Sequence, residues 1–255
     1  MNFLKHVDSV FKKNKHAYAG KYFSNTLSDI NVSNNKFKFD FIFNDKNSPE
    51  FLALNNPIQF IYKYLNQETI DKAIRINPEI SVILKENNLS FEYEIKNVSS
   101  IIASHLLPTS RYAQIIYQNM NKIIEYDELT TLVQASLIHD IGKIFIPKEI
   151  LNKTGRLTLN ERKIIELHNK LSFEILITTN LNQKVAHLAW QHHDYENSFK
   201  RTMLNQILMI ADIYSALKET RPYRKALNNL TAKTILYDMG ASGKFDVGYI
   251  RYLCV

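Results

Sequence analysis

Six side chains in the second half of the sequence have the chemistry of metal ligands. A histidine–aspartate pair ends an apolar segment, and further histidines and an aspartate follow it on helix-like segments: His139, Asp140, His168, His192, His193 and Asp212. Imidazole binds Zn, Fe, Mn or Ni, and a carboxylate can bridge two such ions. Two close divalent ions can clamp a phosphoryl group and lower the pKa of a bound water until it attacks as hydroxide. The pattern therefore favours a phosphoester hydrolase.

Both of these aspartates lie in strongly apolar segments. Asp140 follows Leu137-Ile138, and Asp212 lies within the segment 210–214. A carboxylate buried in such a segment is costly unless it is paired or bound to a metal ion. Either one alone would more often be a salt-bridged core residue. Both together, in one chain with these histidines, favour a metal site.

The elements that carry these residues are predicted to be helices. Thr158 and Glu161 form a capping box, and the helix that they begin should turn His168 inward. Pro222 ends the last of the helices. The expected ranges are 158–178, 183–191 and 204–217. Metal ligands projected from facing helices are typical of an all-helical bundle.

Residues 1–97 have a different pattern. Period-two alternation over 37–43 and 91–95 predicts two strands. Asn-Pro pairs predict the starts of two short helices, over 58–65 and 79–86. No residue in this half has an evident catalytic role. We expect a small mixed α/β or mostly helical module that senses, docks or dimerises.

Composition excludes several classes of protein. With 45% hydrophobic and 22% charged residues, the 255-residue chain can bury a core. The single cysteine, Cys254, excludes an internal disulfide and a thiolate zinc site, and it fits a reducing cytosol. There is neither a membrane-length apolar segment nor a signal-peptide core near the first residue. We therefore expect a cytoplasmic protein without a membrane partner.

The positive net charge of +7 lies mostly in the second half. Residues 101–255 hold 19 of the 32 Lys+Arg and 14 of the 25 Asp+Glu, which gives +5. This charge would favour an anionic phosphate substrate, but it would serve solubility equally well. No basic run with interleaved aromatic residues is present, so a nucleic-acid polymer is not an expected partner.

The chain from about residue 101 to 255 resembles the HD-domain metal-dependent phosphohydrolases. Within them it resembles the HD-GYP family of cyclic di-GMP phosphodiesterases. Seven blocks follow the family's order: 139–143, 146–158, 166–168, 192–194, 210–217, 221–226 and 243–246. Any one block alone would be weak evidence of the resemblance, but seven blocks in the family's order are highly specific to it. The resemblance implies a mainly α fold, with an HD-type all-helical bundle over 98–255 and the smaller α/β or α module over 1–97.

The resemblance also implies the ligands of two divalent ions. The ions are expected to be iron or manganese, with zinc, nickel or magnesium as alternatives. Asp140 would bridge them, the other ligands of the first ion being His139 and Asp212. The second ion would be held by His168, His192 and His193.

Charged side chains around these ions would act on the phosphate. Lys143 would stabilise charge at the scissile phosphate or protonate the leaving oxygen, and Asp140 with Lys143 would be the catalytic pair. Arg221, Arg224 and Lys225 would contact substrate phosphates. A solvated helix start would explain these three cations as well.

The sequence departs from the family pattern at three places. Pro108 stands where the family has its first histidine, and proline cannot bind a metal ion. His105 could replace that ligand, or it could be an ordinary residue of a helix start. The Gly-Tyr-Pro loop is absent, and Asp194 stands where the family usually has glutamate.

These observations leave two functions open. The first is a metal-dependent phosphodiesterase in which metal-bound hydroxide attacks phosphorus, with cyclic di-GMP as substrate. Another cyclic dinucleotide or a phosphomonoester is an alternative substrate. The second is a catalytically degenerate module that binds a nucleotide or a protein partner for signalling. Redox chemistry on a di-iron site is a distant third. A homodimer or a signalling partner would bind through residues 1–97.

Overall fold

The computed structural model describes residues 45–93, 95, 102–120, 123–194, 201–220 and 225–253. Residues from Lys46 to Val255 form one compact unit. Every regular element in these described ranges is helical, as expected of a mainly α protein. The strand expected over 37–43 lies outside the described residues.

Four helices precede residue 97. They are α3 (Pro49–Asn55), α4 (Pro57–Tyr64), α5 (Gln67–Ile76) and α6 (Pro78–Glu86). The helices predicted after the two Asn-Pro pairs are confirmed as α4 and α6. Asn56 caps α4 by accepting from the Gln59 amide, and Asn77 caps α6 by accepting from the Glu79 amide. A proline at the first helical position favours each start, because its missing amide hydrogen has no partner there anyway.

The strand expected over 91–95 does not form in its described residues. Phe91, Glu92 and Tyr93 have no ladder partner and form a bend followed by irregular loop. The Tyr93 hydroxyl instead donates to Asp71 Oδ1 over 2.7 Å and accepts from Gln67 Nε2 over 2.6 Å, which ties the segment to α5. The alternation predicted a strand, but a strand needs a partner edge, and none is present in the described part of the chain.

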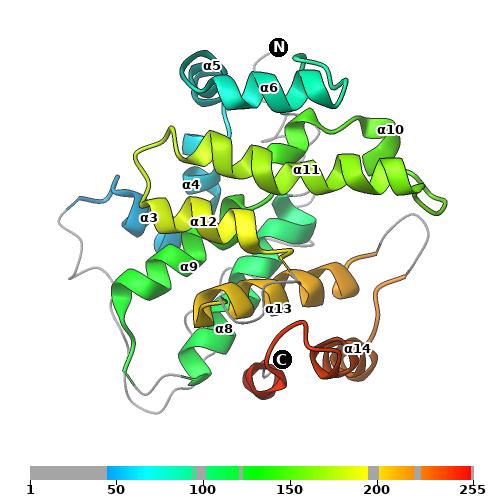
Figure 1. Ribbon diagram of the computed structural model, residues 1–255. Helices are drawn as coiled ribbons and strands as arrows, with labels where there is room; N and C mark the ends of the chain where they lie inside the picture. Colours follow the sequence, from blue (N-terminus) through cyan, green and yellow to red (C-terminus); the bar gives the residue numbers. More distant parts are fainter. Residues whose placement is uncertain are drawn as a thin grey trace. The chain divides into compact units, whose positions relative to one another are not determined.

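The bundle begins with a π-helical turn, η3 (Ile102–Leu106), that continues directly into α8 (Leu107–Met120). The other elements are α9 (Tyr126–Ile138), η4 (Ile141–Phe145), α10 (Lys148–Leu151), α11 (Leu159–Leu176), α12 (Gln183–Gln191), α13 (Met203–Lys218), α14 (Asn229–Ala241) and η6 (Val247–Tyr252). In Figure 1, α11 and α12 lie side by side, with α13 and then α14 on the side away from α5 and α6. The three helices predicted to carry ligands are confirmed as α11, α12 and α13.

Helix α9 is the centre of the bundle. Every residue from Leu129 to Ile138 is buried, and α9 packs against α3, α4, α8, α12 and α13. A helix that is buried on all sides needs uncharged side chains, and residues 129–138 contain no charged residue. Because His139 caps the end of α9, the histidine–aspartate pair lies inside the bundle.

The helices before residue 97 pack against the bundle. Helices α3 and α4 contact α9, and helices α5 and α6 contact α11. Asn77 Nδ2 donates to both the backbone carbonyl and the carboxylate of Glu174 on α11, over 2.9 and 2.8 Å. These helices therefore support the two elements that carry His139 and His168, and the role expected for residues 1–97 as a separate module stays a prediction.

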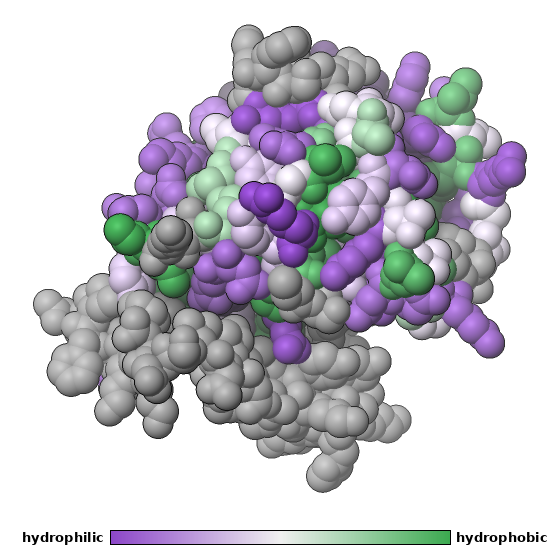
Figure 2. Space-filling view, turned by 90° about the horizontal axis from the view of Figure 1, so that it is seen from below, coloured by the Kyte–Doolittle hydropathy of each residue, from purple (hydrophilic) through white to green (hydrophobic). Residues whose placement is uncertain are grey.

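The length and the composition of the described helices bear on membrane insertion. Among the described helices, none combines the length and the apolar composition that crossing a bilayer requires. Figure 2 shows that polar side chains cover most of the coloured part of one face, with hydrophobic side chains in separate small patches.

A single glycine allows η4 to pack on α11. The amide of Gly142 donates to Ser172 Oγ over 2.9 Å. A Cβ at Gly142 would lie 2.3 Å from the carbonyl oxygen of His168 and 2.7 Å from the amide nitrogen of Ser172. Such distances are too short for non-bonded backbone atoms, so one of the two elements would have to move. The absence of a side chain at residue 142 thus sets the distance between the loop that follows His139 and the helix that carries His168.

The hydrogen bonds of Thr158 at the start of α11 should contribute to the stability of the protein. Thr158 Oγ1 accepts from the Glu161 amide over 3.2 Å, and Glu161 Oε2 accepts from the Thr158 amide over 2.7 Å. Replacing Thr158 by alanine should lower the free energy of unfolding by about 1 kcal/mol, because an amide at the start of α11 loses its acceptor. Urea denaturation measures this change. Thr158→Ser keeps the hydroxyl and should behave like the wild type; equal losses in both variants would contradict the prediction.

The close packing at Gly142 should make the protein sensitive to any side chain at this residue. Gly142→Ala should destabilise the protein by about 1–3 kcal/mol or more, since a methyl group is forced against rigid backbone. Gly155→Ala is the matched control, because nothing lies within 4 Å of the added Cβ there. Its free energy of unfolding should stay within about 0.5 kcal/mol of the wild type. Equal stability of the two variants would show that η4 does not pack on α11 in this way.

Candidate metal centre

The structure brings all six sequence-predicted ligands together at the centre of the bundle. His139 ends α9 and Asp140 follows it, whereas His168 lies within α11. His192 ends α12, with His193 next to it, and Asp212 lies within α13. The ligand atoms in each of three groups lie within 4.8 Å of one another: His168, His192 and His193; His105, His139 and Asp140; and His139, His192 and Asp212.

The two oxygens of Asp140 face different imidazoles. Its Oδ1 lies 3.2 Å from His168 Nε2 and 3.9 Å from His192 Nε2. Its Oδ2 lies 3.5 Å from His139 Nε2 and 3.6 Å from His105 Nε2. The carboxylate is 1% exposed. This is the arrangement that a carboxylate bridging two ions requires.

Asp212 closes one side of the site. Its Oδ1 lies 2.8 Å from His105 Nε2 and 3.6 Å from His139 Nε2. Its Oδ2 lies 3.8 Å from His193 Nδ1. Helix α13 thus supplies a second buried carboxylate to the same group of imidazoles that the Oδ2 of Asp140 faces.

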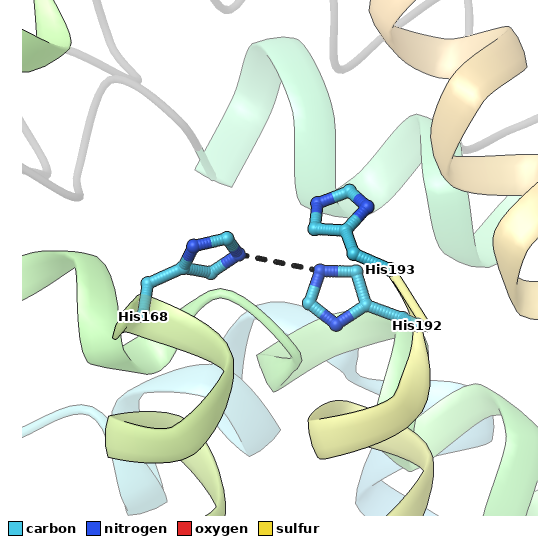
Figure 3. A group of neighbouring side chains, drawn as sticks. All are labelled: His168, His192 and His193. Atoms are coloured by element: carbon cyan, nitrogen blue, oxygen red, sulfur yellow. Dashed lines mark hydrogen bonds between the residues drawn. The ribbon is translucent and has the colours of Figure 1, made fainter. Parts of the chain in front are cut away.

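The other side of the site consists of three histidines. Figure 3 shows that His168, from α11, turns its ring toward His192 and His193, from the end of α12. The Nε2 atoms of His168 and His192 are 3.4 Å apart. The side chain of His193 is 30% exposed, whereas His168 and His192 are almost fully buried. His193 therefore marks the side on which the site approaches solvent.

Three of the histidines are oriented by the backbone in the same way. The Nδ1 atoms of His139, His168 and His192 each lie within hydrogen-bond distance of the carbonyl oxygen three residues earlier, at 3.0, 2.5 and 2.6 Å. A carbonyl only accepts, so each Nδ1 carries the proton and each Nε2 presents a lone pair. A backbone carbonyl bonded to the second ring nitrogen is the usual support of a metal-binding histidine.

Among the six predicted ligands, two buried side-chain atoms lack a hydrogen-bond partner. They are His139 Nε2 and Asp140 Oδ1. Buried polar atoms are almost always paired, and an exception calls for an explanation such as an ion. Both atoms face the middle of the site, so a divalent cation fits the residues that surround it.

The charges of the site match those of metal ligands. Burial alone would raise the pKa of Asp140, but Lys143 and the neighbouring His139 and His168 hold it well below the ordinary value. Burial likewise opposes ionisation of Asp212, and interactions with His105 and His139 outweigh it, so its pKa is also well below the ordinary value. Both carboxylates are therefore ionised at neutral pH.

The imidazoles differ in whether nearby carboxylates outweigh the effect of burial on their pKa. Burial lowers the pKa of His192 well below its ordinary value and that of His193 to about 4. Both rings are thus neutral at neutral pH, the form that binds metal ions. For His139, burial acts in the same direction, but Asp140 and Asp212 outweigh it and raise the pKa. A cation between these carboxylates would take the place of the proton that they favour on His139.

Lys143 lies at the edge of the centre. Its Nζ is 2.6 Å from Asp140 Oδ2, and its side chain is 19% exposed. An ammonium group in this place is close both to the Asp140 carboxylate and to solvent. Of the three cations expected to contact substrate, Lys225 is exposed between α13 and α14. Arg221 and Arg224 lie outside the described residues.

The sequence left His105 open, and the structure places it in the centre. His105 belongs to the π-helical turn η3 and is 4% exposed. The signal in the sequence was its place three residues before Pro108, where the family pattern has a histidine. That signal was weak, because a histidine at this place could equally be an ordinary residue of a helix start.

Comparisons with known proteins agree with this geometry. The sequence profile of the HD-domain family matches residues 96–248, which is more than half of the chain. The cyclic di-GMP phosphodiesterase response regulator RpfG of Xanthomonas campestris is 30% identical over 122 residues, or 44% of this chain and 32% of that protein. A cyclic di-GMP phosphodiesterase of Thermotoga maritima is 26% identical over 189 residues, or 68% of this chain and 51% of that protein.

A further relative acts on a different cyclic dinucleotide, according to its name. The 3'3'-cGAMP-specific phosphodiesterase 3 of Vibrio cholerae is 31% identical over 105 residues, or 38% of this chain and 23% of that protein. This chain thus spans between about a quarter and a half of the length of these three relatives. The profile covers the helices that carry the histidines and aspartates described above, and the chain belongs to the HD-domain phosphohydrolase family.

Proposed function

We propose that this protein is a metal-dependent phosphodiesterase that hydrolyses a cyclic dinucleotide. The observation that carries the proposal is the position of Asp140. Its two buried oxygens face two separate groups of imidazoles, so one carboxylate can bridge two ions. Two bound divalent ions would neutralise charge on a phosphodiester and lower the pKa of a coordinated water.

The proposed ligand sets follow the two sides of the site. His139, Asp140 and Asp212 would hold the first ion, and His168, His192, His193 and Asp140 would hold the second. No thiolate is among them, and mixed imidazole and carboxylate ligands suit iron or manganese. Zinc, nickel and magnesium are weaker candidates. We propose that each chain binds two ions.

Lys143 is proposed to act on the leaving group. Its ammonium lies beside the bridging carboxylate and reaches the partly exposed edge of the site. There it would stabilise the charge that develops on the phosphate, or donate its proton to the leaving oxygen. Arg221, Arg224 and Lys225 would hold the phosphates of the substrate through charge-assisted hydrogen bonds.

The names of the relatives support the class of substrate. They include proteins named for cyclic di-GMP and for 3'3'-cGAMP. The positive net charge of +7 favours an anionic ligand. Cyclic di-GMP is the first candidate and 3'3'-cGAMP the second. The inward-facing ligand atoms and these relatives favour hydrolysis over a degenerate binding module. Residues 1–97 are proposed to regulate the site or to mediate dimerisation.

The hydrolytic proposal predicts a specific pattern of variants. With Mn²⁺ or Fe²⁺, the wild type should convert cyclic di-GMP to a linear dinucleotide, measured by chromatography. Asp140→Asn should lower kcat by about 100-fold or more, because the amide carries no charge to hold two ions. Lys143→Ala should lower kcat while the metal content stays unchanged. His187→Ala is the control, since His187 lies against Phe173 on the outer face of α12.

One outcome would contradict hydrolysis. A wild type that contains two ions per chain and cleaves neither cyclic di-GMP, 3'3'-cGAMP nor bis(p-nitrophenyl) phosphate would leave the degenerate binding module as the better account.

Metal content makes a separate prediction. Elemental analysis of the protein as purified should give close to two divalent ions per chain. Treatment with a chelator should remove them and lower the melting temperature, because ions that bind only the folded state stabilise it. Asp140→Asn should reduce the count. A count close to zero in protein purified with iron and manganese present would overturn the metal site and the phosphodiesterase together.

A further inference from the structure

We infer that His105 is a ligand of the first ion, presented by the π-helical turn that precedes Pro108. The inference rests on the metal site proposed above and adds a residue to it. Its consequence is that the first ion has four protein ligands: His105, His139, Asp140 and Asp212. The loss of the family's histidine at residue 108 would then not leave this side of the site incomplete.

The position of the imidazole is the first argument. His105 Nε2 lies 2.8 Å from Asp212 Oδ1 and 3.6 Å from Asp140 Oδ2. The rings of His105 and His139 are 5.6 Å apart between centroids. The ligand atoms of His105, His139 and Asp140 lie within 4.8 Å of one another. Two carboxylates and two imidazoles thus face one small volume, which is a ligand set suited to a divalent cation.

The backbone of the turn explains why His105 reaches this place. Pro108 is the second residue of α8. Proline lacks an amide hydrogen, and in a regular α-helix its ring clashes with the carbonyl of the residue four positions earlier. The residues directly before α8, Ile102–Leu106, form a π-helical turn instead of a regular α-helix. His105 therefore has a different helical register from the one that a regular α-helix continuing into α8 would give it.

A hydrogen bond fixes this turn to the helix that carries Asp212. The hydroxyl of Ser215, on α13, donates to the backbone carbonyl of His105 over 3.1 Å. Ser215 is buried and lies one helical turn after Asp212. The His105 backbone and the Asp212 carboxylate are thereby held on one side of the site by the same element.

His105 differs from the other histidines in its second nitrogen. Its Nδ1 is buried without a hydrogen-bond partner, whereas His139 Nδ1 bonds to a backbone carbonyl. Such partners contribute about 10–100-fold to metal affinity. We therefore expect His105 to be the weakest of the histidine ligands, so that its removal costs the first site about tenfold in affinity rather than abolishing binding.

The simplest competing role for His105 is a hydrogen-bond donor to Asp212. Two substitutions separate the roles. His105→Ala removes the ligand and the donor, whereas His105→Gln keeps an N–H donor of similar length and removes the imidazole. His187→Ala controls for the loss of a histidine elsewhere on the bundle.

The test measures metal binding on the full chain. Mn²⁺ is titrated into metal-free protein by calorimetry, and metal content is measured after dialysis. Both His105 variants should bind the first ion about tenfold less tightly and retain fewer ions than the wild type and His187→Ala. With excess chelator, each variant should show a cooperative thermal unfolding transition, which indicates that it is folded without metal. If His105→Ala is not folded, His105→Gln alone decides.

Wild-type affinity in His105→Gln would overturn the inference and assign His105 a hydrogen-bonding role. Wild-type affinity in both variants would overturn it as well. These results are distinguishable from a failure of the proposed function: His105-dependent metal binding without hydrolysis of a cyclic dinucleotide would overturn the phosphodiesterase and leave the ligand in place.

Discussion

The burial of one carboxylate at the end of the central helix is the constraint on which the site depends. Asp140 is 1% exposed, and an isolated charge at this depth would be strongly destabilising. The ammonium of Lys143 and the surrounding imidazoles compensate for it, as the lowered pKa of Asp140 indicates. Five elements, η3, α9, η4, α11 and α12, each place such a group within 3.9 Å of one of its two oxygens.

Helix geometry provides much of that arrangement at low cost. His139, His168 and His192 each use the carbonyl three residues earlier in their own helix or turn. The acceptor is therefore present wherever the histidine is helical, and no distant residue is needed to set the tautomer. The three Nε2 atoms are oriented before any ion binds, which reduces the reorganisation that binding requires.

Packing between helices then sets the distances. Helix α9 places Asp140, α11 places His168, and η4 lies close to α11 only because residue 142 has no side chain. Helices α3 to α6 contact α9 and α11 from outside. Changes far from the ligands can therefore alter the site, and this gives residues 46–93 a structural role.

The sequence by itself determined the local features. The Thr158 capping box and the Asn-Pro pairs predicted where helices begin, because hydrogen bonds at a helix start depend on nearby residues. The types and order of the histidines and aspartates predicted a cluster of imidazoles and carboxylates, and their assignment as ligands stays a prediction. Tertiary structure alone decided that the 91–95 alternation forms no strand in its described part, since a strand needs a distant partner. It also decided that a π-helical turn before Pro108 brings His105 to Asp212. That contact joins residues far apart in the chain, and only the packing of η3 and α8 on α13 creates it.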